Sequence, residues 1–229
     1  MSFISTLELQ LDAHNKPVIY YSSDHENCIN SQMVACVVKP LGRRVYLASA
    51  GSREPRHVAV KIVHGKSEVR RLEHEADIYR KELKGLQGKI VPKFYGLYTA
   101  SHYGVDAAVM ILEYCGTGTD PTLDFNEFNR LLMLAACKLH QVGIVHGALS
   151  DHRHILAVGR QIRIIDFANA GHSHQCFGAL PTLDNNSSVS RGCDELERLE
   201  REYGSQEMKT THANLLQRLP QKFRQWIST

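Results

Sequence analysis

The sequence predicts an α+β fold in which most of the strands precede most of the helices. Short apolar and β-branched runs, typical of strands, are concentrated between residues 33 and 112. A segment with apolar residues at helical spacing interrupts them at residues 67–86, and a second helical pattern follows at residues 124–142. Two further short runs, at residues 155–158 and 162–165, are joined by a Gly-Arg turn. The 229 residues are enough to bury a core without disulfides.

The composition excludes several classes of function. With 43% hydrophobic and 22% charged residues the chain has the balance of an ordinary globular protein, and its net charge of +3 gives no indication of nucleic-acid binding. No apolar run approaches the roughly 20 residues of a membrane span, and we expect neither a secretory leader nor a membrane partner. The six cysteines show no C-x-x-C spacing, which favours a reducing compartment. We therefore expect a cytoplasmic or nuclear protein.

A lysine lies inside an apolar strand pattern, in the run His-Val-Ala-Val-Lys-Ile-Val at residues 57–63. Because removing water from an ammonium group is costly, Lys61 needs an anionic partner unless it reaches solvent. The helix predicted at residues 67–86 offers two carboxylates, Glu73 and Glu75, one on each side of its apolar stripe. The helical pattern alone does not decide between them.

The polar cluster around which the chain is organised lies in its second half. Residues 144–170 have the sequence I-V-H-G-A-L-S-D-H-R-H-I-L-A-V-G-R-Q-I-R-I-I-D-F-A-N-A. Two short strands joined by a turn form a hairpin whose end carries polar side chains, and Asp166 follows the second strand directly. A helix that begins after Asp124, a good N-cap residue, leads into this segment. We expect a functional site at this end of the hairpin.

The order of these motifs resembles that of the protein kinases, and in particular of the shortened kinase-like proteins of fungi. V-A-V-K at residues 58–61 resembles the kinase strand whose Lys binds the α/β-phosphates, while H-G-A-L and D-F resemble the catalytic and metal-binding loops. The resemblance implies a bilobal protein-kinase-like fold, with an antiparallel sheet plus one helix in the N-lobe and a mostly helical, trimmed C-lobe. It divides the chain into an extension at 1–32, an N-lobe at 33–116 and a truncated C-lobe at 117–229.

The resemblance also implies a nucleotide site, with ATP and Mg²⁺ as its cofactors. The implied cofactor-binding residues are Gly42, Lys61, Glu75, Glu113 and Cys115. The implied catalytic residues are Asp151 and Asp166, and Asp166 is also the implied metal ligand. Glu75 is the expected ion-pair partner of Lys61, and Glu113 and Cys115 supply backbone contacts to adenine. Gly42 is the one glycine left where kinases have a Gly-rich loop, and a plain hairpin turn explains it equally well.

The sequence departs from the kinase pattern where phosphoryl transfer is most demanding. Ala148 replaces the Asp that orients the substrate hydroxyl, and Ala168 replaces the Gly that follows D-F. The Asn that holds a second metal ion falls on Arg153 by counting, or on His154 if the following strand is aligned. Asp151, a few residues further along the loop, is the remaining candidate for a base.

The last part of the chain is too short to build the helices on which kinases bind protein substrates. Residues 181–192 are rich in Asn and Ser, and a helix is predicted at residues 193–202, with Asp194 as the expected brace of the catalytic loop. A final short helix is predicted at residues 215–227. The second lobe is therefore expected to be trimmed.

Three functions follow from these patterns. The first is a degenerate kinase-like protein, a pseudokinase that binds ATP with weak or no phosphotransfer. The second is an active phosphotransferase that acts on Ser/Thr or on a small hydroxylated molecule. The third is a metal-binding or scaffolding module, because several soft-metal donors are close in sequence. These donors are His152, His154, His172, His174 and Cys176. The sequence identifies neither a protein partner nor a small-molecule substrate.

Overall fold

The structure is a computed structural model. It describes residues 6–11, 16–23, 32–51, 55–102, 104–116, 118, 123–176, 178 and 193–204. The polar segment predicted at residues 181–192 and the last helix predicted at residues 215–227 lie outside these ranges.

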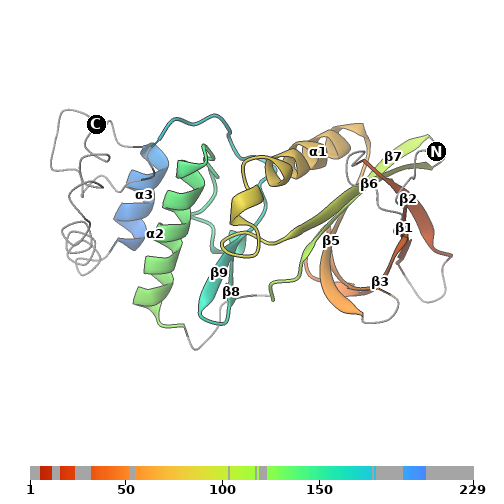
Figure 1. Ribbon diagram of the computed structural model, residues 1–229, viewed down its shortest axis with the longest axis horizontal. Coiled ribbons are helices and arrows are strands. Elements are labelled where there is room, and N and C mark those ends of the chain that lie inside the picture. The colour runs from red at the N-terminus through yellow and green to blue at the C-terminus, as the bar shows by residue number, and fades with distance from the viewer. Residues whose placement is uncertain are drawn as a thin grey trace.

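Seven strands of the described chain close into a barrel, which forms one end of the molecule (Figure 1). Around the barrel the strands are β1 (Thr6–Gln10), β2 (Val18–Ser22), β6 (Phe94–His102), β7 (Val105–Glu113), β5 (Arg56–His64), β4 (Val45–Ala50) and β3 (Gln32–Pro40). Neighbouring strands are antiparallel except β1 and β3, whose parallel pairing closes the ring. Leu7 and Leu9 of β1 alternate with polar residues, and both side chains are fully buried.

The predicted bilobal protein-kinase-like fold, with an antiparallel sheet in one lobe and a mostly helical second lobe, is wrong. The sheet is not open, because β1 pairs with β3 and β2 pairs with β6, so that both of its edges are covered. The strands that close it come from the first 32 residues, where only an extension was expected. The described chain also has just three α-helices. The architecture is a closed barrel with a small helical part beside it.

The side chains of β5 and β7 alternate between two faces, and each face packs into a different core. Val60 and Ile111 point into the barrel interior, which is filled by apolar side chains from all seven strands. Val63 and Met110, of opposite parity, lie on the outer face and belong to a second core against the helices. Lys61 shares the outer face with Val63, so the alternation of β5 places its ammonium group outside the barrel.

The helices and a hairpin lie along and beyond one side of the barrel (Figure 1). These elements are α1 (Lys66–Arg80), α2 (Phe125–Gln141), the hairpin strands β8 (Ile155–Val158) and β9 (Gln161–Ile164), and α3 (Asp194–Tyr203). Short 3₁₀ turns occur at Lys84–Leu86 and His152–His154. The Asp124 side chain accepts a hydrogen bond from the Asn126 N–H, which confirms the predicted cap of α2. No described helix combines the length and apolarity needed to cross a membrane.

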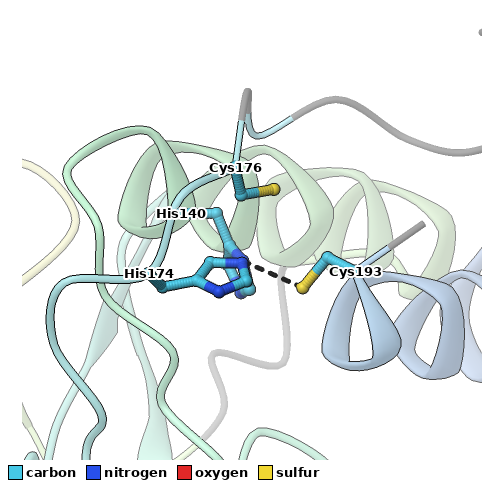
Figure 2. Close-up of side chains that lie close together, drawn as sticks. All are labelled: His140, His174, Cys176 and Cys193. Carbon is cyan, nitrogen blue, oxygen red and sulfur yellow. Dashed lines mark hydrogen bonds between the residues drawn. The ribbon is translucent and has the colours of Figure 1, made fainter. Parts of the chain in front are cut away.

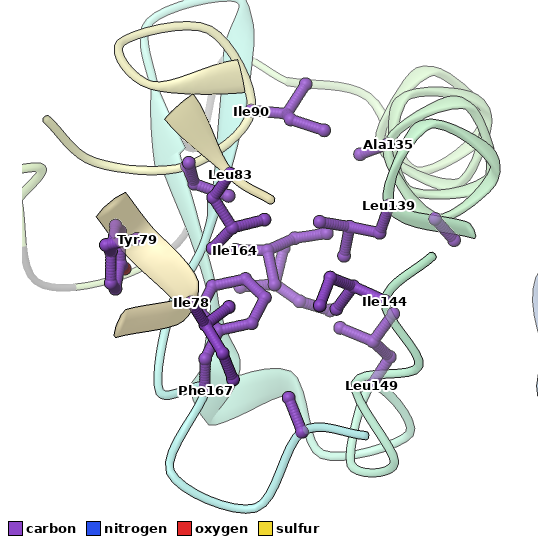
Figure 3. Close-up of a cluster of buried hydrophobic side chains, with 14 of the residues drawn as sticks. Ile78, Tyr79, Leu83, Ile90, Ala135, Leu139, Ile144, Leu149, Ile164 and Phe167 are labelled. Atoms are coloured by element: carbon purple, nitrogen blue, oxygen red, sulfur yellow. The ribbon is translucent and has the colours of Figure 1, made fainter. Parts of the chain in front are cut away.

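The second core joins these parts through Phe167 (Figure 3). Its ring is fully buried and makes edge contacts with Tyr79 of α1, at 5.6 Å between ring centroids, and with His146, at 5.0 Å. Leu139 of α2 and Ile164 of β9 belong to the same cluster. The residue after Asp166 is thus anchored between α1 and the segment that follows α2.

Candidate functional site

Three charged groups from distant parts of the chain converge on one point. The Lys61 Nζ lies 2.7 Å from Glu75 Oε2 and 2.8 Å from Asp166 Oδ1. Glu75 is 1% exposed on the inner face of α1, whereas Glu73 is exposed, so the structure decides between the two carboxylates. The sequence placed Lys61, Glu75 and Asp166 together, and the structure brings them together. Their roles in binding stay predictions.

The charges of this triad stabilise one another. Burial by itself lowers the pKa of Lys61, but the attraction of Glu75 and of Asp166 outweighs it, so the pKa of the ammonium group is raised. Burial raises the pKa of Asp166, yet the opposite charge of Lys61 outweighs burial and lowers this pKa. Burial raises the pKa of Glu75 in spite of Lys61. The carboxylate of Glu75 therefore depends on Lys61 to remain ionised.

The backbone around Asp166 is held by three contacts. Asp166 has a φ of 67°, in the left-handed region that few residues other than Gly, Asn and Asp adopt. The Phe167 N–H donates to Glu75 Oε1 at 3.2 Å, and the His146 Nε2–H donates to the Ile165 carbonyl at 3.0 Å. Together with the buried Phe167 ring, these bonds fix an unusual backbone conformation that aims the Asp166 carboxylate at Lys61.

The triad lies in a cleft of about 1030 Å³ between the outer face of the barrel and the β8–β9 hairpin. Its walls are apolar, with Ala59 and Leu112 on the barrel side and Leu156 on the hairpin. Its rim is basic, with Arg43, Arg44 and Arg71. Arg44 and Arg71 are both paired with Glu68, and Arg71 also donates to Asn169 Oδ1 at 2.8 Å. An apolar space with charged groups at one end is the usual form of a small-molecule site.

Gly42 lines the cleft, but its backbone is already used. The N–H groups of Leu41 and Gly42 both donate to the Val45 carbonyl, at 2.8 and 3.0 Å, and close the turn between β3 and β4. A phosphate would need free N–H groups at this point. The geometry favours the plain hairpin turn over the remnant of a phosphate-binding loop.

Glu113 and Cys115 lie at the end of β7, on the wall of the cleft, where adenine contacts were expected. The Glu113 N–H donates to the Lys93 carbonyl at 2.9 Å, while its own carbonyl receives a weak contact from Cys115 Sγ at 3.6 Å. Burial raises the pKa of the Cys115 thiol to about 12, so it stays protonated. The segment borders the cleft, and its role in binding a base stays a prediction.

Asp151, the candidate base, is engaged by an ion pair. Its carboxylate accepts bonds from Arg153 at distances down to 2.6 Å and also caps the turn His152–His154. The Arg153 guanidinium holds the pKa of Asp151 well below its ordinary value, which makes it a weak proton acceptor. Ala148 offers no carboxylate in its place.

His154, one of the two residues that the sequence offered at the second metal-ligand position, lies beside Asp166. Its Nε2 lies 3.7 Å from Asp166 Oδ2, and its Nδ1 lies 3.1 Å from the Ala148 carbonyl. The Arg153 side chain is 87% exposed and turned to Asp151. Of the two candidates for this position, His154 therefore lies beside Asp166, whereas Arg153 points to Asp151.

The loop before the hairpin is braced by Glu195, not by Asp194 as predicted. The Glu195 carboxylate accepts hydrogen bonds from the N–H groups of His146, at 3.0 Å, and Gly147, at 2.5 Å. Asp194 is exposed. The helical repeat could have identified the correct residue, since Glu195 lies one and two turns from the buried Leu199 and Tyr203.

The predicted soft-metal donors do not form one group. His152 stacks on Phe128, His154 lies in the cleft and His172 packs near His74. His174 and Cys176 instead lie beside two donors that the sequence reasoning missed, His140 and Cys193. His174 and Cys176 are two residues apart, but no short-range spacing links them to His140 or Cys193, so no motif could have signalled the whole group.

The cleft thus offers a paired ammonium group, a partly exposed carboxylate and an apolar wall, but no unengaged base among the described residues. Such groups can bind a polar ligand, but without an unengaged base they do not favour proton transfer. No protein-family model matches the sequence, and no curated protein matches it either.

Proposed function

We propose that the cleft binds ATP together with Mg²⁺ and that the protein acts as a pseudokinase, with weak or no phosphotransfer. The observation that supports this most is the meeting of Lys61 with Glu75 and Asp166 inside the cleft. An ammonium group has three N–H donors, and these two carboxylates use two of them. The third is left for a phosphate oxygen.

The residues present fit one magnesium ion. The Asp166 carboxylate is 44% exposed and is a hard oxygen ligand of the kind that Mg²⁺ prefers. Bound there, the ion would neutralise phosphate charge. His154, on the other side of Asp166, is a poor ligand for Mg²⁺, so the site has one good position for the ion where kinases have two.

Weak or absent transfer follows from the two positions that would supply a base. Ala148 has no acidic group, and the carboxylate of Asp151 is bound to Arg153. A general base must lie within hydrogen-bonding distance of the proton that it removes. Without one, bound ATP has no activated acceptor, and the cleft works as a binding site.

The test is titration of the purified protein with ATP and Mg²⁺, followed by thermal unfolding and calorimetry. We expect stabilisation that reaches about 2.7 kcal/mol when ATP is at 100 times its dissociation constant. Lys61→Met and Asp166→Asn should each abolish it, whereas Lys66→Met, at an exposed lysine on α1, should not. No stabilisation of the wild type, or equal stabilisation of Lys61→Met, would remove the proposal.

A transfer assay with labelled ATP separates the pseudokinase from an active phosphotransferase. We expect no label on Ser/Thr proteins or on small hydroxylated molecules above the rate in buffer. Transfer by the wild type that disappears in both Asp151→Asn and Asp166→Asn would favour the enzyme instead. Ala148→Asp restores the missing acid, and activity that appears only in this variant would support the pseudokinase.

An intracellular location, cytoplasmic or nuclear, is proposed from the cysteines. None of the described cysteines forms a disulfide; they are Cys36, Cys115, Cys137, Cys176 and Cys193. Chains that fold in oxidising compartments usually pair such residues.

A further inference from the structure

Four metal-binding side chains meet where three segments of the chain come together (Figure 2). His140 belongs to the last turn of α2, His174 and Cys176 follow the β8–β9 hairpin, and Cys193 is the N-cap residue of α3. One ligand atom from each residue lies within 4.8 Å of the other three. The group is separate from the cleft, whose lining includes none of the four.

Two thiols and two imidazoles are the ligand set of structural zinc sites. Zinc takes tetrahedral coordination with bonds of about 2.3 Å to sulfur and 2.0–2.1 Å to nitrogen, which sets the ligand atoms roughly 3.3–3.8 Å apart. Cys193 Sγ already lies 3.3 Å from His140 Nδ1 (Figure 2). The distances between the other ligand atoms would need to shorten by at most about 1.5 Å. Side-chain rotation is sufficient for such a shift.

The surroundings orient the two histidines toward this point. The fully buried His140 donates its Nε2–H to Glu195 Oε2 at 2.8 Å, which leaves the Nδ1 lone pair directed at Cys193. A carboxylate behind a histidine is the usual outer support of a zinc ligand. His174 Nε2 is buried and has no hydrogen-bond partner among the described residues. A buried nitrogen without a partner calls for an explanation, and a metal ion supplies one.

We propose that His140, His174, Cys176 and Cys193 form a structural zinc site. All four positions are filled by protein ligands, so the ion has no open position for catalysis. It fastens the start of α3 and the segment after the hairpin to the end of α2.

The site also supports the cleft from behind. Glu195, which holds His140, holds the N–H groups of His146 and Gly147 through the same carboxylate. His146 in turn binds the Ile165 carbonyl next to Asp166. Zinc therefore stiffens the loop that positions Asp166, but its binding does not depend on whether ATP binds.

The first experiment measures metal directly in the full chain. Protein purified without chelator should contain one zinc per chain by elemental analysis. After removal of zinc, titration with Co²⁺ should give the visible bands of tetrahedral cobalt and a thiolate charge-transfer band, both saturating at one equivalent. A wild type that takes up neither ion at this stoichiometry overturns the proposal.

Matched variants identify the ligands. Cys193→Ser and His174→Gln should weaken zinc binding at least about 100-fold, while Cys36→Ser and His172→Gln should not change it. Cys36 is an exposed thiol on β3, and His172 is an exposed imidazole two residues before a ligand. Equal losses in the two sets would show that binding is adventitious and would overturn the assignment.

The role of Glu195 is tested separately. Glu195→Gln should weaken zinc affinity about 10–100-fold, and Asp194→Asn, at the exposed neighbour, should leave it unchanged. Circular dichroism checks that each variant is folded. If the ligand variants do not fold, the cobalt spectrum of the wild type decides, since a spectrum without thiolate charge transfer contradicts the site. A Cys176–Cys193 disulfide in protein purified without oxidant would also contradict it.

Discussion

Lys61 lies on the outer face of β5 with a carboxylate on each side of its ammonium group. Replacing it with Met leaves Glu75, which is 1% exposed, without its counter-charge. Breaking one side of a buried ion pair typically costs about 3–5 kcal/mol. We expect Lys61→Met to lower the free energy of unfolding by about 3 kcal/mol at pH 8, measured by urea denaturation. Lys61→Met/Glu75→Gln should recover much of this loss, because no buried charge remains.

The effect of Lys61→Met should depend on pH. Burial raises the pKa of Glu75, and removing Lys61 takes away the attraction that opposes this rise. A carboxyl whose pKa is higher in the folded state than in the unfolded state contributes stability at low pH that is lost as the pH rises. The variant should therefore be closer to the wild type at pH 5 than at pH 8. If the stability difference between the variant and the wild type is the same at pH 5 and pH 8, the role assigned to Glu75 is wrong.

The sequence predicted the chemical type of most site residues but not always the right member of a pair. The helical pattern alone left Glu73 and Glu75 open, although the family resemblance selected Glu75. Asp194 was chosen where Glu195 acts, because a helical pattern fixes a face only to within a residue. The sequence named His174 and Cys176 as metal donors but missed His140 and Cys193, because these two join them only through tertiary packing.

The segment after β9 depends on one aromatic anchor. Phe167 is fully buried between Tyr79 and His146, and it follows the residue that faces Lys61. Phe167→Ala should lower the free energy of unfolding by about 3–5 kcal/mol, because it opens a cavity in the second core. The matched control is Phe125→Ala on α2, where the side chain is 68% exposed and a change within about 0.5 kcal/mol is expected. If urea denaturation gives the same loss of stability for Phe167→Ala and Phe125→Ala, the Phe167 ring does not pack in the second core as described.

Individual elements followed their sequence patterns closely, because those patterns are local. The structure has α2 at Phe125–Gln141 and β8 at Ile155–Val158, close to the predicted ranges. The helix predicted at residues 67–86 is split into α1 and a 3₁₀ turn. Such elements are determined by hydrophobic periodicity and by capping residues, and both signals lie within a short stretch of the chain. The pairing of β1 with β3 joins segments far apart in the sequence, so no local sequence pattern predicts it.

The barrel makes the first strands part of the core and not an appendage. Leu9 of β1 is fully buried in the barrel interior, while Leu11, two residues later, is 43% exposed. Leu9→Ala should lower the free energy of unfolding by about 2–5 kcal/mol, and Leu11→Ala by no more than about 0.5 kcal/mol. If thermal and urea denaturation give the same small change for both, β1 does not contribute to the barrel core in solution.

Barrel closure has a consequence for how the chain folds. The Ser23 hydroxyl, just after β2, donates to the Leu97 carbonyl of β6, 74 positions further along. The pairing of β2 with β6 therefore cannot form during synthesis until β6 has emerged. Closing a long loop costs conformational entropy before its contacts can form and stabilise the chain. Chains dominated by such long-range contacts therefore fold slowly. We expect refolding in milliseconds to seconds rather than microseconds, with the ring completed last.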